Sequence, residues 1–370
     1  MKIGIDMRMA GGGAGISRYI ESLASQILAL DKNKYVLFFN RLDSTLRSRF
    51  ASFGAEMVET GIGHYTFDEQ YKLPSILNKY DLDLVHFPHF NVPVLYRKPF
   101  VVTIHDLTHT RFPGRKKSRI IHRLAYNFIL KKSIQRSKKI IAVSQSTKKE
   151  ILEFFPRTPS EKIMPIYEGV APGYRIMNKH EAFEKLSPNF QIKKPFLLYV
   201  GVWRRYKNLP ALAQAFDLIA EKHGLDLVLA GAEDPYYPEI KEQILGIKNA
   251  HRVRILGRVS DEDLNLLYNA AELMVLPSFY EGFGLTVLEA AACGTPVACS
   301  DIPTLREVMG QAAEYFDPNN IENMADVLSG IIASPNRAEE LANLGLSRVK
   351  HFSWKQAALE TINVYKEAIK

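Results

Sequence analysis

Two glutamates in one short segment are the residues of this chain best suited to chemistry. Glu281 and Glu289 lie in the run SFYEGFGLTVLEAAACGT, residues 278–295. The two glycines after Glu281 predict a tight turn, and Leu285 to Cys293 predict a helix that is apolar nearly all round. Burying Glu289 in such a helix without a partner would be costly, so we expect it to meet a hydrogen-bonding partner or a ligand.

The start of this predicted helix is suited to binding a diphosphate. Free N–H groups and the positive end of the helix dipole would attract the anion. With a carboxylate on each side, the site suits a nucleotide sugar, which has ribose hydroxyls at one end and hexose hydroxyls at the other. The run GVWRRYKN, at Gly201 to Asn208, adds cations directly after a predicted strand. Cations at the carboxyl end of a strand would attract an anion.

The elements that position these residues follow an α/β pattern. Short strand patterns alternate with helical ones, such as Ser17 to Leu30, which predicts two βαβ series and hence two parallel sheets covered by helices. The polar segment 178–194 between the series is interpreted as a linker. Ligands of such sheets bind at the carboxyl ends of strands, so we expect the site in a cleft between two domains. The predicted strands are 2–7, 35–39, 82–87, 100–104, 139–143, 195–201, 225–231, 252–259, 272–277 and 296–300.

The motif EGFGLTVLE, followed by GTPV, resembles the signature of retaining glycosyltransferases of family 4. These enzymes have the GT-B fold, in which two Rossmann-like domains face each other across a cleft. The resemblance implies an N-terminal acceptor-binding domain at residues 1–180 and a nucleotide-sugar donor-binding domain at 190–352. It also implies that a C-terminal helix at 354–370, for which Ser353 is a plausible cap, packs back on the first domain.

The resemblance also implies roles for the residues of the second domain. Glu281 would contact the transferred sugar, and Glu289 the ribose. Lys207 matches the family's diphosphate-binding lysine, but the family's arginine falls where this sequence has Val202 or Tyr206. The remaining donor-site calls are Arg205 as the preferred arginine, Arg204 as the reserve, and Phe283, Gly284 and Leu285 beside the glutamates.

In the first domain, the glycine-rich run AGGGAGISRY at residues 10–19 does not fit a dinucleotide fingerprint, because Arg18 occupies the third glycine position. NAD binding is therefore disfavoured. The run resembles the family's first loop, in which Gly13 and Gly15 would approach the donor. In the motif TIHDL, His105 would lie near the reacting face of the sugar. Asp106 could orient the imidazole or bind the acceptor. Ser144, Glu168 and Gly169 fall at positions that the family uses around the cleft, but they could instead serve as a helix cap and a turn.

Composition and charge exclude several classes of protein. The chain has 370 residues, 48 Lys or Arg, 40 Asp or Glu and two cysteines, as expected for two globular domains. No apolar run is long enough to span a membrane, which predicts a cytoplasmic protein, and Cys293 and Cys299 read as buried thiols. Asp81 and Asp83 could suggest a metal site, but they open a strand, so we expect solvated carboxylates and no metal.

The expected function is that of a metal-independent, retaining hexosyltransferase without a resident cofactor. The motifs TIHDL and YEGV most resemble those of bacterial mannosyltransferases of surface polysaccharide synthesis, which favours GDP-mannose as donor and a lipid-linked glycan as acceptor. One alternative is a nucleotide-sugar 2-epimerase, which has a similar two-domain architecture. The other is a basic anion- or nucleic-acid-binding protein, which would leave both glutamates unexplained; we expect no nucleic-acid partner.

Residues 111–149 contain 13 Lys or Arg and no acidic residue. Within them, Ile121, Leu124, Ala125 and Phe128 share one face of a predicted helix. Two alternatives stay open for this segment. The apolar face packs on the sheet beneath an ordinary basic surface, or the segment makes peripheral contact with the anionic inner face of the plasma membrane. The second alternative also assigns membrane contacts to Arg115, Lys116, Lys117 and Arg119.

Overall fold

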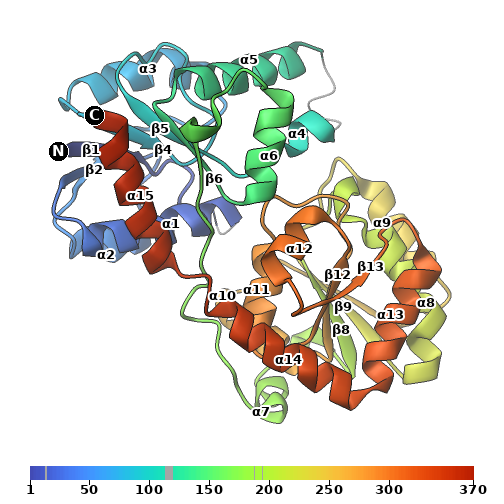
Figure 1. The fold of residues 1–370 in the computed structure, drawn as a ribbon. Coiled ribbons are helices and arrows are strands. Elements are labelled where there is room, and N and C mark those ends of the chain that lie inside the picture. Colours follow the sequence, from blue (N-terminus) through green and yellow to red (C-terminus); the bar gives the residue numbers. More distant parts are fainter. Residues whose placement is uncertain (13–14, 113–119, 187, 194) are drawn as a thin grey trace. The chain divides into compact units, whose positions relative to one another are not determined.

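The structure is a computed structural model that describes every residue except 13–14, 113–119, 187 and 194. The chain divides into two compact units. Unit 1 comprises Met1–Gly169 and Ser353–Lys370, and unit 2 comprises Val170–Phe352. Each unit is a parallel β-sheet flanked by helices (Figure 1). No helix of the described residues combines the length and apolar character needed to cross a membrane.

Unit 1 contains a seven-stranded parallel sheet in the order β3-β2-β1-β4-β5-β6-β7. The strand order reverses between β1 and β4, which is where α/β sheets bind ligands. The strands are β1 (Lys2–Asp6), β2 (Lys34–Phe39), β3 (Glu56–Glu59), β4 (Leu84–Phe87), β5 (Phe100–Ile104), β6 (Lys139–Ala142) and β7 (Ile163–Pro165). The helices are α1 (Gly15–Leu30), α2 (Ser44–Ala51), α3 (Phe67–Asn78), α4 (Thr108–Arg111), α5 (Ile120–Arg136), α6 (Gln145–Phe154) and α15 (Trp354–Ile369).

Unit 2 repeats this plan with six parallel strands in the order β10-β9-β8-β11-β12-β13. Here the order reverses between β8 and β11, so the loops after these two strands form the expected ligand edge. The strands are β8 (Phe196–Val200), β9 (Asp226–Ala230), β10 (Val253–Gly257), β11 (Leu273–Leu276), β12 (Val297–Ser300) and β13 (Glu314–Phe316). The helices are α7 (Lys179–Glu184), α8 (Leu209–His223), α9 (Pro238–Leu245), α10 (Asp261–Ala270), α11 (Leu285–Ala292), α12 (Pro303–Met309), α13 (Ile321–Ala333) and α14 (Pro335–Val349).

The sequence located most of these elements but not all of them. All ten predicted strands are present, with ends that differ by at most two residues. The sequence missed β3, β7 and β13, which lack the continuous apolar run that marks most of the other strands. The segment 178–194, expected to be a linker, contains the helix α7 and belongs to unit 2. Its Ala182 is buried, so this segment packs within unit 2 and is more than a linker.

The C-terminal helix α15 belongs to unit 1. Ser353 caps it, accepting a hydrogen bond from the backbone N–H of Gln356. Tyr365 reaches into the sheet, where its hydroxyl oxygen lies 2.7 Å from Nδ1 of the buried His86 on β4. The ring of Trp354 packs 5.7 Å from that of Tyr19 on α1. The helix therefore carries part of the core of unit 1.

The orientation of α5 differs from one of the two alternatives considered for it. Tyr126, Leu130 and Ile134 point into the core, whereas Leu124 and Phe128 are 63% and 51% exposed. The alternative in which the face with Leu124, Ala125 and Phe128 packs on the sheet is therefore wrong. The residues at positions 126, 130 and 134 also have helical spacing, and this second stripe packs in the core of unit 1. The side chain of Ile121 and residues Arg115, Lys116, Lys117 and Arg119 lie outside the description.

Candidate functional site

The carboxyl edge of the unit 2 sheet brings Lys207 and Glu281 into contact. Lys207 lies in the 3₁₀ turn after β8 and Glu281 in the loop after β11, with Nζ and Oε1 2.6 Å apart. The loops are joined by a hydrogen bond from the N–H of Phe279 to the carbonyl of Tyr206. Burial lowers the pKa of Lys207, but the Glu281 carboxylate, with smaller contributions from Tyr206 and Tyr199, gives a net rise. The pair is thus a charged, preorganised contact.

The two arginines of the same loop are held by separate acids. Nε of Arg204 lies 2.8 Å from Asp234, and Arg205 donates to Glu239 from Nη2, also at 2.8 Å. Both guanidinium groups lie within 6 Å of the ring of Tyr237. Asp234 is buried, whereas the side chain of Arg205 is mostly exposed. Arg204 is consequently the cation whose acidic partner is the more buried of the two.

Glu289 has the hydrogen-bonding partner that its buried position requires. It lies on α11 and is almost fully buried, and its Oε2 accepts a hydrogen bond of 2.9 Å from the hydroxyl of Tyr268 on α10. The helix follows Gly284, whose φ of +95° favours glycine. A Cβ at Gly284 would also lie 2.7 Å from Leu305. Phe283 is buried against Phe352, and Leu285 begins the helix.

At the carboxyl edge of the unit 1 sheet, His105 follows β5 with both ring nitrogens engaged. Nε2 lies 2.9 Å from the carbonyl oxygen of Pro88, which can only accept, so Nε2 carries a proton. Nδ1 faces the Glu168 carboxylate at 3.4 Å. Burial opposes the charge, but Glu168 and the carbonyl outweigh it and raise the pKa of His105. The Glu168 carboxylate and the Pro88 carbonyl thus shift the ring towards its protonated form.

Other predicted residues of unit 1 have structural contacts. Ser144 caps α6, accepting a hydrogen bond from the N–H of Thr147. Asp106 accepts from the N–H of Thr108 at the start of α4. A Cβ at Gly169 would lie 2.2 Å from the backbone nitrogen of Trp354, so only glycine fits there. Gly15 is the first residue of α1, and Gly13 lies outside the described residues.

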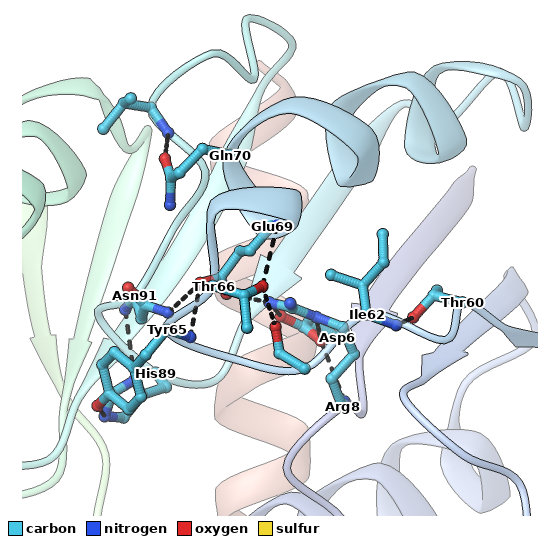
Figure 2. A network of polar contacts seen from close by, with 12 residues as sticks. Asp6, Arg8, Thr60, Ile62, Tyr65, Thr66, Glu69, Gln70, His89 and Asn91 are labelled. Atoms are coloured by element: carbon cyan, nitrogen blue, oxygen red, sulfur yellow. Dashed lines mark hydrogen bonds and ion pairs between the residues drawn. The ribbon is translucent and has the colours of Figure 1, made fainter.

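The sequence did not indicate a buried polar network at the same edge of unit 1. Figure 2 shows Arg8, which follows β1, beside Glu69 at the start of α3 and Asn91 after β4. The Glu69 carboxylate accepts hydrogen bonds from the side chains of Arg8, at 2.6 Å, and Asn91, at 2.5 Å. Charged residues far apart in the chain show no local pattern that would reveal such a contact. In the described part of the chain, no group of three or more His, Cys, Asp or Glu side chains could hold a metal ion.

Comparison with known proteins identifies the family. Residues 13–173 match the model described as Glycosyltransferase Family 4, and residues 181–347 match that of Glycosyl transferases group 1. The O-antigen chain mannosyltransferase B of Escherichia coli is 32% identical over 296 residues, which cover 78% of this chain and 76% of that protein. This chain belongs to the family 4 glycosyltransferases. The O-antigen chain mannosyltransferase RfbU of Salmonella typhimurium is 28% identical to this glycosyltransferase over 70% of the chain and 68% of its own length.

Solved structures agree on the fold of this glycosyltransferase. Anabaena HepE, in a structure described as a complex with UDP and glucose, superposes with a TM-score of 0.77 over 99% of both chains at 17% identity. At that identity the similarity concerns the fold alone. The resemblance to GT-B enzymes noted in the sequence is confirmed by this fold and by the family models.

Proposed function

We propose that this glycosyltransferase transfers a hexose, with retention of configuration, from a nucleoside diphosphate sugar to an acceptor hydroxyl. The ion pair of Lys207 and Glu281 is the observation that carries the proposal. It places a cation and a carboxylate side by side where the strand order of the sheet reverses. The cation suits a leaving diphosphate, and the carboxylate suits the hydroxyls of the transferred sugar.

In the proposed reaction, the bond between C1 of the sugar and the diphosphate oxygen breaks, and the diphosphate gains negative charge. Lys207 and Arg204 stabilise this charge, and the N-terminus of α11 adds N–H donors. A diphosphate oxygen takes the proton of the acceptor hydroxyl while the new bond forms on the same face of the sugar. Because cationic side chains meet the leaving group, we expect transfer without a metal ion.

The preferred donor is GDP-mannose, and the preferred acceptor is a lipid-linked glycan of polysaccharide or lipopolysaccharide synthesis. Two relatives carry names that describe O-antigen mannosyltransferases, which supports this choice. The complex of HepE with UDP and glucose makes UDP-glucose the natural competitor. GDP-mannose should therefore raise the melting temperature more than UDP-glucose, because a ligand that binds only the folded state stabilises it.

The test measures sugar transfer or slow donor hydrolysis with the donor that stabilises the protein, with and without a chelator. Lys207→Met should abolish the activity, whereas Lys248→Met, which breaks an exposed ion pair with Glu221, should leave it unchanged. Loss of activity on chelation with recovery in magnesium would contradict the metal-independent step. Release of an epimerised nucleotide sugar without any acceptor would contradict transfer itself.

We also propose that unit 1 contacts an anionic membrane surface through α5. The exposed Leu124 and Phe128 lie one helical turn apart, and Lys132 lies over the Phe128 ring at 5.7 Å. Lys131 is exposed beside them, and the helix contains no acidic residue. Apolar side chains ringed by cations suit the boundary between acyl chains and anionic headgroups. This contact would bring the enzyme to a lipid-linked acceptor.

Binding to vesicles tests this contact. The protein should bind vesicles that contain phosphatidylglycerol, and added salt should release it. Replacing Lys131 and Lys132 with Gln should weaken binding about 30-fold, since each basic residue contributes about 1 kcal/mol. Replacing the exposed Lys355 and Lys366 of α15 is the matched control and should have little effect. Equal binding to phosphatidylcholine vesicles, or none at low salt, would contradict the proposal.

A further inference from the structure

We infer that Tyr65 and His89 form a platform for a sugar ring of the acceptor, an inference that rests on the proposed function. Both residues lie at the carboxyl edge of the unit 1 sheet, Tyr65 after β3 and His89 after β4 (Figure 2). Their rings are perpendicular, with centroids 6.0 Å apart, and the tyrosine hydroxyl lies 3.5 Å from Nε2 of His89. Tyr65 is 49% exposed, so part of its side chain lies at the surface.

The backbone of Tyr65 is strained. Its φ is +60°, a left-handed conformation that is unfavourable for a bulky side chain. Its N–H donates a hydrogen bond of 2.9 Å to Oε2 of Glu69, which holds the residue in place. Strain of this kind persists where the surrounding structure enforces it, and it concentrates at binding and catalytic sites.

The group that enforces this strain is itself costly to bury. Glu69 is 1% exposed, and it contacts Arg8, which also pairs with Asp6 through Nη2 at 2.8 Å. Burial raises the pKa of Glu69 even though Arg8 lowers it. Because apolar residues of similar volume often give equal or greater stability, a buried ion pair is weak evidence for a stabilising role. The geometric effect of this pair is to fix the Tyr65 backbone at the ligand edge.

His89 has a defined donor at the platform. Its Nδ1 accepts a hydrogen bond from the N–H of Asn91 at 3.3 Å, so in the neutral ring the proton lies on Nε2, beside the Tyr65 hydroxyl. The platform thus offers an aromatic surface, an N–H donor and a hydroxyl. These groups complement a sugar, which has an apolar C–H face and hydroxyls on its edge.

The position of the platform favours the acceptor over the donor. The His89 ring is nearly parallel to that of His105, with centroids 6.5 Å apart, so the platform adjoins the residue expected near the reacting sugar. The residues proposed to bind the donor, Lys207 and Glu281, belong to unit 2. A neutral sugar also fits the charge, because Arg8, which contacts Glu69, is paired with two carboxylates.

Tyr65→Gly is the decisive variant. Glycine adopts a positive φ without strain, so the melting temperature should stay the same or rise while the ring is lost. Losing one stacking contact should raise the acceptor KM about tenfold. Saturation-transfer NMR with methyl α-D-mannopyranoside, methyl α-D-galactopyranoside and methyl α-D-glucopyranoside should show contact with the wild type for at least one glycoside, and a loss of that signal in Tyr65→Gly.

Tyr71→Ala on α3 is the matched control, because this tyrosine is 67% exposed and should leave the glycoside signal intact. A Tyr65→Gly protein that keeps the signal, or that melts several degrees lower than the wild type, would overturn the inference. Absence of signal with all three glycosides, or an equal loss in Tyr71→Ala, would also overturn it. The melting-temperature shift of the wild type with nucleotide sugars judges the proposed function separately, because it involves no acceptor.

Discussion

The contact between Lys207 and Glu281 makes a quantitative prediction about stability. At 2.6 Å, an effective dielectric constant of about 20 corresponds to an attraction of about 6 kcal/mol, which the desolvation of both groups largely offsets. Removing one partner removes the attraction but leaves the other charge in a poorly hydrated position. The side chains are only 16% and 10% exposed, so each single change should cost about 3 kcal/mol.

Lys207→Met, Glu281→Gln and the double variant together form a double-mutant cycle. For a unit of this size, a loss of 3 kcal/mol lowers the melting temperature by about 6–12 °C. The double variant leaves no stranded charge, so it should cost less than either single change, giving a coupling energy of at least about 3 kcal/mol. Differential scanning calorimetry on the full chain measures all four proteins.

The matched control is the exposed pair of Lys248 and Glu221, whose Nζ and Oε1 atoms are 2.9 Å apart. Solvent screens this pair, so the corresponding changes should leave the melting temperature within error and show no coupling. If the two site variants were additive, or if either of them raised the melting temperature, the proposed charged and poorly hydrated contact would be refuted.

Three further predictions concern other parts of the site. Glu168→Gln should lower the pKa of His105, which an NMR titration measures. In the wild type, the raised pKa stabilises the fold most below about pH 6.5, and this contribution is lost as the pH rises through the pKa of the folded state. If Glu168→Gln lost the same stability at all pH values, the pairing of His105 with Glu168 would be contradicted. Gly169→Ala should lower the melting temperature of unit 1 and expose α15 to proteolysis, because the added methyl meets the backbone of Trp354, and an unchanged digestion pattern would contradict this. Glu289→Ala should raise the donor KM more than it lowers kcat, as expected for a ribose contact, and unchanged kinetics would contradict that role.

The sequence by itself was sufficient for features that depend on neighbouring residues. Short runs of apolar, strand-forming residues located ten strands, and the apolar run after Gly284 predicted α11. The motif around Glu281 and Glu289 indicated the family that the comparisons confirm. The burial of Glu289 could also be predicted, because a glutamate in a helix that is apolar on every side has no solvated face.

The tertiary structure decided what depends on distance in space. Two stripes of α5 have helical spacing, and only packing against the sheet showed that Tyr126 is buried and Phe128 exposed. The contact of Arg8 with Glu69 joins residues 61 positions apart, which no local periodicity encodes. Hydrogen bonds and charge pairs act over a few ångströms, so they depend on which strand ends meet. The order of the strands in the sheet decides which strand ends lie side by side, and a sequence pattern does not contain this order.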